Sequence, residues 1–135
     1  MNEVEAYELF SIAADHIEQL FYGFFSLVTA FLVMTYLAAD KLDRVFSVIV
    51  VSFYSLCCLW FFIATFAWRT DGTSLYAEML LKKSNGVYEM EWFGNNPDWM
   101  SVVATGLNAS LIVGGWLVSI GYFIYRRRQV RMGGT

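Results

Sequence analysis

Three long apolar runs without a charged residue constrain this chain more than any other feature. They cover residues 20–39, 45–68 and 100–125. An α-helix needs about 20 mostly apolar residues to cross the hydrocarbon core of a bilayer, and each run reaches that length. The sequence therefore predicts an all-α integral membrane protein with three transmembrane helices, spanning about 17–39, 45–68 and 99–125.

The size of the chain limits what else it can contain. It has 135 residues, of which 58% are hydrophobic, and its mean hydropathy is +0.50. Three spans leave no room for a separate catalytic or nucleotide-binding domain, so we expect one membrane domain over residues 1–135. The N-terminus carries Glu3, Glu5 and Glu8 where a signal peptide would carry basic residues. We therefore expect the first span to be retained.

Basic residues predict the orientation in the membrane, because cytoplasmic loops are enriched in Lys and Arg. With three spans, the turn 40–44 and the tail 126–135 lie on one side, and they hold twice as many basic residues as the opposite side. This favours an external N-terminus and a cytoplasmic C-terminus. The tail is predicted to bind anionic lipid headgroups, or else a cytoplasmic partner, through Arg126, Arg127, Arg128 and Arg131.

The first helix is expected to begin outside the membrane. Asn2 and Glu5 have the spacing of a capping box, and nothing up to residue 39 stops a helix. An extension over residues 2–16 would thus project from the bilayer. Its apolar stripe must pack on something, and it consists of Ala6, Leu9, Phe10, Ala13 and Ile17.

Residues 69–98 are predicted to form a partly ordered external loop. The sequence Asp71-Gly72 indicates a turn, and Ser74 would then cap a short helix over 75–83 that ends at 84–86. An extended stretch over 87–93 follows, with Tyr88, Met90 and Trp92 facing inward. The third helix should begin with Asn96 as its cap and Pro97 in its first turn.

Two predicted helices carry polar stripes at three- and four-residue steps, with a gap at Val33 in the first and at Ile112 in the second. The first stripe consists of Glu8, Ser11, Asp15, Glu18, Tyr22, Ser26, Thr29 and Tyr36. The second consists of Ser101, Thr105, Asn108, Gly115, Ser119 and Tyr122. Polar groups inside a bilayer avoid lipid, so these stripes must meet each other, meet another subunit or line water.

Helix packing and a pore are the two interpretations of these stripes. In the first, the packing residues within or between subunits are Thr105, Asn108, Ser110, Gly114, Gly115 and Ser119, since small and hydroxyl side chains allow close approach. In the second, the first helix lines a pore with Asp15, Glu18, Tyr22, Ser26 and Thr29.

No motif for catalysis or for a bound cofactor is found. The sequence has no phosphate-binding glycine loop, HExxH, CxxC or GxSxG pattern. We therefore expect neither an enzyme nor a cofactor, a metal or a nucleic-acid partner. His16 is the single histidine, and it is expected to be a solvated interfacial residue, with pH sensing or metal binding as alternatives.

These features predict a small non-enzymatic membrane protein that self-associates and acts as an assembly or accessory subunit. Its acidic outer face would meet a partner, and a bacterial inner membrane is the expected location. The alternative is a homo-oligomeric channel or pore lined by the first helix. In bare topology the chain resembles the three-span phage holins, which have an external N-terminus and a basic cytoplasmic tail, and the resemblance covers architecture only.

Overall fold

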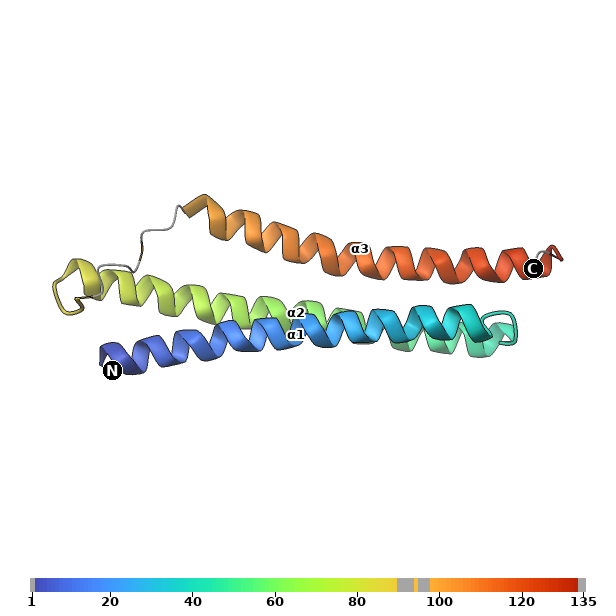
Figure 1. Ribbon diagram of the computed structural model, residues 1–135, viewed down its shortest axis with the longest axis horizontal. Helices are drawn as coiled ribbons and strands as arrows, with labels where there is room; N and C mark the ends of the chain where they lie inside the picture. The colour runs from blue at the N-terminus through green and yellow to red at the C-terminus, as the bar shows by residue number, and fades with distance from the viewer. Residues whose placement is uncertain (1, 90–93, 95–97, 134–135) are drawn as a thin grey trace.

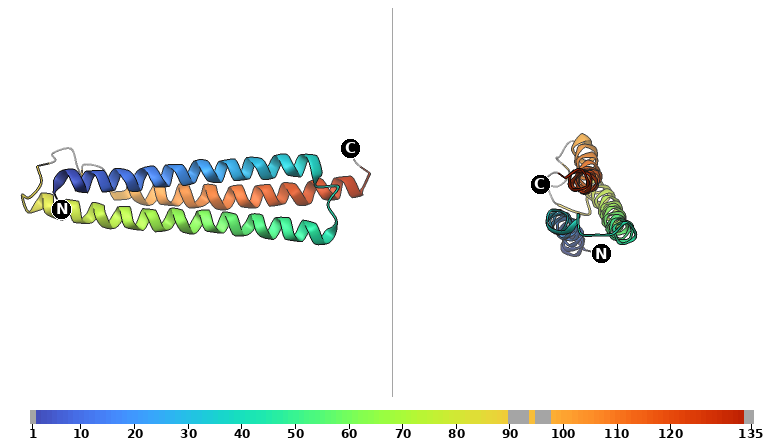
Figure 2. Two further views of the ribbon diagram at one scale, coloured as in Figure 1. Left: turned by 90° about the horizontal axis from the view of Figure 1, so that it is seen from below. Right: turned by 90° about the vertical axis from the view of Figure 1, so that its right-hand side faces the viewer.

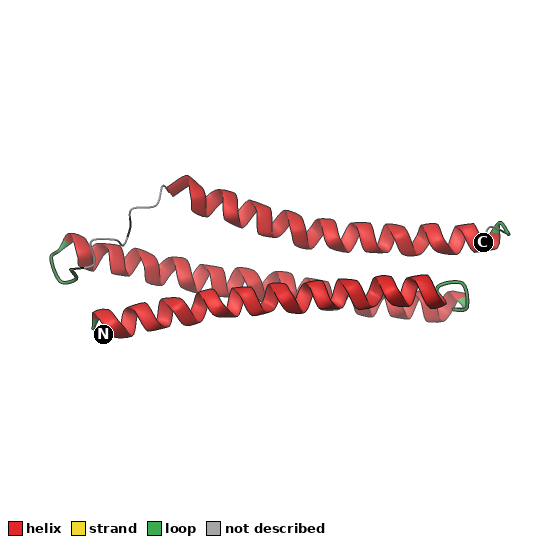
Figure 3. Ribbon diagram, viewed as in Figure 1, coloured by secondary structure: helices red, strands yellow, loops and turns green. Residues whose placement is uncertain are grey.

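The computed structural model describes residues 2–89, 94 and 98–133, and in this part of the chain all regular structure is helical. The helices are α1 (Glu3–Ala38), α2 (Arg44–Ser84) and α3 (Asp98–Arg131). Figure 1 shows α1 and α2 side by side along their length, with α3 packed on them near the α1–α2 turn. Towards the other end α3 diverges from α1 and α2, and the described part of the connections between the helices consists of loops and turns (Figure 3).

All three helices are long enough and apolar enough to cross a membrane, as predicted. At 1.5 Å per residue, α1, α2 and α3 are about 54, 60 and 50 Å long, whereas the hydrocarbon core is about 30 Å thick. The chain thus has the character of an integral membrane protein, and each of its helices is longer than the hydrocarbon core is thick. In Figure 2 the α1–α2 turn and the C-terminus lie at the same end, which we call the turn end.

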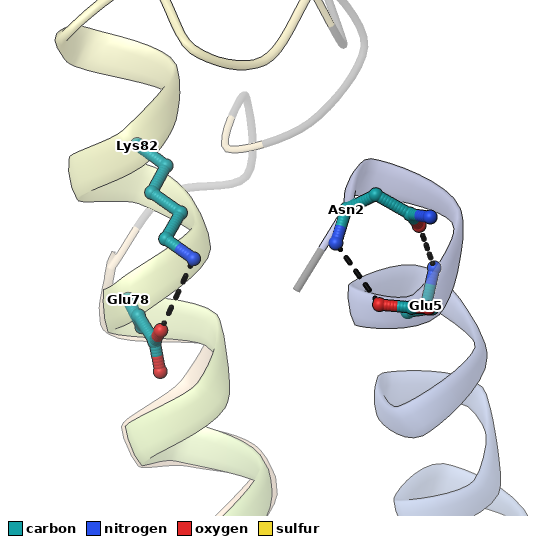
Figure 4. A network of polar contacts seen from close by, with 4 residues as sticks. All are labelled: Asn2, Glu5, Glu78 and Lys82. Atoms are coloured by element: carbon teal, nitrogen blue, oxygen red, sulfur yellow. Dashed lines mark hydrogen bonds and ion pairs between the residues drawn. The ribbon is translucent and has the colours of Figure 1, made fainter.

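The predicted N-terminal cap of α1 is confirmed. The Asn2 side chain accepts a hydrogen bond from the Glu5 backbone N–H at 2.8 Å, and the Glu5 carboxylate accepts one from the Asn2 N–H at 3.1 Å (Figure 4). This capping box satisfies two backbone donors that no helical carbonyl can reach. It explains why the helix starts at once, far ahead of the apolar run.

A tight turn separates α1 from α2, as the sequence predicted. Asp43 caps α2 by accepting a hydrogen bond from the Phe46 N–H at 2.6 Å. The two helices therefore form an antiparallel hairpin with a very short connection.

The turn predicted at Asp71-Gly72 is wrong, and with it the separate helix capped by Ser74. α2 continues through this segment to Ser84. The hydroxyls of Thr70 and Thr73 donate to the carbonyls of Phe66 and Arg69, one helical turn back. The predicted loop 69–98 is therefore helical over its first half.

Burial against α1 explains why α2 does not break. An apolar cluster, separate from the main core described below, contains Ala6 of α1, Met79 of α2 and Tyr88. Phe10, Leu75, Tyr76 and Leu80 pack around it. Burying several large side chains stabilises the helix by more than the roughly 1 kcal/mol that one interior glycine costs.

The apolar stripe of the α1 extension packs on α2, apart from one residue. Ala6 and Ala13 are buried and Phe10 and Ile17 are half-buried, whereas Leu9 is 49% exposed and was wrongly included. Lys82 and Glu78 form an ion pair one turn apart on α2, with 3.4 Å between Nζ and Oε1 (Figure 4).

The helix stop predicted at residues 84–86 is confirmed. Asn85 is the C-cap of α2, and Gly86 has a φ of 75°, a conformation that favours glycine because other residues carry a Cβ. Tyr88 is buried, as predicted. Met90, Trp92, Asn96 and Pro97 lie outside the described residues.

The main core lies where the three helices pack together, in the part of the bundle nearer the turn end. The ring of Phe31 stacks on that of Tyr54 at a centroid distance of 3.8 Å. The buried members come from every helix and from the turn: Phe24, Phe31, Ala39, Tyr54, Cys58, Ile112 and Phe123.

Candidate functional site

The polar stripe predicted on the third helix faces the interior of this chain over part of its length. Ser119 is 1% exposed, and its hydroxyl lies 2.7 Å from that of Tyr54. One turn away, Trp116 Nε1 donates to the Ser55 hydroxyl at 3.0 Å. These bonds join α3 to α2, so this part of the stripe is used in packing within one subunit.

Arg69 extends these polar contacts towards the N-terminal end. Its Nη1 atom donates to the Thr105 hydroxyl of α3 at 3.2 Å. The sequence pattern does not predict this contact, because it assigns Arg69 to the external loop. Once α2 continues as a helix, the side chain of Arg69 reaches α3 and lines a cleft of about 390 Å³ with Phe10 and Ser101.

Gly115 is a true packing residue. A Cβ built on it would lie 3.2 Å from two ring atoms of Phe24, so its lack of a side chain lets α3 approach α1 closely. Asn108 is half-buried, and within the described residues its side chain makes no hydrogen bond. It does not bridge the helices of one chain.

Two other predicted packing residues face away from this chain. Ser110 is exposed, and a Cβ added at Gly114 would meet no atom within 4 Å. The same open space surrounds Gly106 and Gly121. We call Gly106, Ser110 and Gly114, which follow one another at steps of four residues, the small-residue face of α3.

The polar stripe of α1 also faces outward. Tyr22 and Tyr36 are 65% and 61% exposed, and Ser26 and Thr29 are exposed with them. The Tyr22 hydroxyl donates to Glu18, and the Ser26 hydroxyl donates to the Tyr22 carbonyl, so these contacts stay within α1. The stripes of α1 and α3 therefore do not meet inside one subunit. We call Tyr22, Ser26, Thr29 and Tyr36 the hydroxyl face of α1.

His16 is not a freely solvated residue. It is half-buried, and its ring stacks on that of Trp68 of α2 at a centroid distance of 4.2 Å. Its neighbours Asp15 and Glu18 are exposed. Among the residues that the structure describes, no three His, Cys, Asp or Glu side chains come together as metal ligands would.

Arg127 of the basic tail has a structural role that the sequence did not reveal. Its Nη1 atom donates to the carbonyl of Leu42 at 3.0 Å and also to the Ser47 hydroxyl. It thereby fastens the end of α3 to the α1–α2 turn. Arg126 lies over the Tyr36 ring at 5.3 Å, while Arg128 and Arg131 are exposed.

Four arginines line a groove at the turn end. It has a volume of about 650 Å³ and lies between the start of α2 and the end of α3. Arg44, Arg127, Arg128 and Arg131 line one part of it, and Val48, Ile120 and Ile124 line another. We call this the arginine groove.

Comparisons with known protein families, with curated proteins and with solved structures gave no match to this chain. The candidate sites are therefore the surfaces themselves: the small-residue face, the hydroxyl face and the arginine groove.

Proposed function

We propose that this chain is a non-enzymatic membrane subunit that self-associates through the outward faces of α3 and α1 and serves in the assembly of a larger complex. The observation that carries the proposal is the small-residue face of α3, which the described residues of this chain leave uncovered and which lies within the predicted third span. Lipid-facing positions normally carry large apolar side chains, whereas small residues four apart are typical of helix–helix contacts.

The hydroxyl face of α1 supports the same conclusion. Four side chains with hydroxyl groups lie on the outside of the bundle, within the predicted span. Polar groups at this depth pair with other protein groups or with water. A second copy of the chain supplies such groups, so the two uncovered faces together favour a homo-oligomer.

The charge distribution supports an orientation with the N-terminus outside. Exposed acids gather at the end opposite the turn and include Glu5, Glu8, Asp15, Glu18 and Asp71. The turn end holds Lys41, Arg44 and the arginine tail. Since basic residues favour the cytoplasmic side, the acidic end becomes the outer face that meets a partner, and a bacterial inner membrane is the membrane we propose.

Native mass spectrometry in mild detergent tests the self-association. Gly114→Leu adds a large side chain to the small-residue face and should shift the protein towards the monomer. Ala104→Leu is the matched control, because Ala104 is exposed on α3 but does not belong to that face. An unchanged number of copies in Gly114→Leu, or an equal loss in both variants, would refute the proposal.

A pore is the second candidate function, and the outward position of Ser26 and Thr29 favours it. In a ring of subunits the hydroxyl face of α1 would line a water-filled path. Ser26→Cys and Thr29→Cys, made in a chain whose Cys57 and Cys58 are replaced by Ala, should then react with a membrane-impermeant thiol reagent. Phe53→Cys, on the exposed side of α2, is the lipid-facing control. Lack of reaction at both positions of α1 excludes the pore.

A further inference from the structure

The arginine groove continues as an apolar groove along the same two helices. A second cavity of about 630 Å³ shares Val51 and Ser52 with it and reaches Leu59 of α2 and Trp116 of α3. Both volumes fall in the range of roughly 300–1,000 Å³ that ligand sites occupy. Together they make one path with a charged end and an apolar end.

The length of this path corresponds to one leaflet of a bilayer. From Arg44 to Leu59 is 15 residues, which is about 22 Å of helix. Half of a bilayer, headgroup region included, measures about 20–22 Å. A chain lying along the groove from the arginines would therefore end near the bilayer centre.

Within the described residues, no acidic side chain lines the turn end of the groove, where its positive charge lies. The ion pair of Lys82 with Glu78 lies at the far end of α2. Asp43, which lies next to Arg44 in the sequence, accepts the Phe46 N–H as the cap of α2. In the part of the chain that the structure describes, no ion pair joins Arg44, Arg128 or Arg131 to a carboxylate.

We propose that the arginine groove and its apolar continuation form a binding site for one anionic phospholipid. The phosphate binds between Arg44, Arg128 and Arg131, and one acyl chain lies along Val51, Ser52 and Trp116. Arginine suits this task because its planar guanidinium group can bind a phosphate through two parallel hydrogen bonds. The site would exist in each subunit, whether or not the chain self-associates.

The expected effect of each arginine follows from membrane electrostatics. A basic residue near an anionic surface contributes about 1 kcal/mol, which corresponds to about fivefold in affinity. Removing two arginines from the groove should then weaken binding of phosphatidylglycerol about 30-fold. The affinity for phosphatidylcholine of the same chain length should change little, because this lipid has no net charge.

Native mass spectrometry with added lipid tests the headgroup part. Wild type and the double variant Arg128→Gln/Arg131→Gln are titrated with phosphatidylglycerol and with phosphatidylcholine. The matched control is Lys41→Gln/Arg126→Gln, which removes the same charge from the same end but leaves the groove intact, since neither residue lines it. We expect the first pair alone to lose the preference for phosphatidylglycerol.

A second variant tests the acyl-chain part with all arginines in place. Ser52→Trp fills the point that the two cavities share, and Phe53→Trp adds an indole at the neighbouring position, which points away from the groove. Ser52→Trp should weaken phosphatidylglycerol binding at least tenfold, and Phe53→Trp should leave it unchanged. Circular dichroism in detergent checks that the variants keep their helix content.

Three outcomes would overturn the proposal. Equal losses in the groove variant and in the Lys41→Gln/Arg126→Gln control would mean that only the overall charge attracts lipid. Unchanged binding in Ser52→Trp would mean that no acyl chain occupies the groove. Displacement of phosphatidylglycerol by millimolar glycerol phosphate, as readily as by the intact lipid, would mean that the site takes a small anion instead.

Discussion

Tyr54 and Ser119 share a buried hydrogen bond, and we expect removal of the serine hydroxyl to lower the stability more than removal of the tyrosine hydroxyl. The Ser119 hydroxyl also donates to the Trp116 carbonyl at 2.9 Å. Its single proton is therefore used, and the Tyr54 hydroxyl must be the donor in the 2.7 Å bond to Ser119. Removing the tyrosine hydroxyl leaves Ser119 with a partner, whereas removing the serine hydroxyl leaves the Tyr54 proton with none but the weakly accepting Cys58 sulfur beside it.

The magnitudes follow from this difference. Tyr54→Phe should lower the free energy of unfolding by about 0.5–1.5 kcal/mol, which is the net worth of one hydrogen bond. Ser119→Ala should lower it by about 1–3 kcal/mol, because a buried donor is left without its acceptor. In the double variant no orphaned donor remains, so the loss should fall back to that of Tyr54→Phe and not reach the sum of the two.

Equilibrium unfolding in mixed micelles, with sodium dodecyl sulfate as the denaturant and circular dichroism as the readout, measures these differences. Tyr125→Phe is the matched control, because its hydroxyl lies on the exposed side of α3, and it should change stability by less than about 0.5 kcal/mol. The reasoning fails if Ser119→Ala costs no more than Tyr54→Phe, or if the losses of the two single variants add in the double variant.

Three further variants test the packing, and the same unfolding assay reads each of them. Gly72→Ala should stabilise the protein by about 0.5–1 kcal/mol, because Gly72 lies inside a helix and the new Cβ would lie 3.8 Å from that of Ala13. A loss of stability would instead support the turn predicted from the sequence. Gly115→Val should cost about 1–3 kcal/mol by overpacking against Phe24, and a neutral effect would mean that α3 does not pack on α1 here. Arg127→Gln should lower the free energy of unfolding by about 1.5–3 kcal/mol, because charge-assisted hydrogen bonds to the turn are lost. Hydrogen exchange at residues 39–47 should become faster. Unchanged exchange there would show that Arg127 does not stabilise the turn.

The sequence predicts local structure correctly where the interacting residues are close together in the chain. The capping box of Asn2 and Glu5, the short turn before Arg44 and the helix stop at Gly86 each depend on contacts within about four residues. The three apolar runs likewise predict three long helices, because each backbone must satisfy its own hydrogen bonds in lipid.

The same local rules gave the wrong result at Asp71-Gly72. This pair is a turn signal when it stands alone. In the folded chain Gly72 lies against Ala13, and the residues after it bury Met79 on the α1 extension. A contact between residues about 60 positions apart therefore decided the local structure, and no window of the sequence contains both partners.

The sequence by itself determined the helical, membrane-type class of this protein, the start of its first helix and its charge asymmetry, because apolar length, caps and charge are properties of short segments. The tertiary structure decided which face of each helix is used. It placed Ser119 inside the bundle and Gly114 outside, although both belong to small or polar positions on one helix. It also showed that Arg127, which the sequence predicts to bind lipid headgroups, donates a hydrogen bond to the α1–α2 turn. The reason is that a helical periodicity predicts which residues share a face, while the direction of that face depends on how neighbouring helices pack.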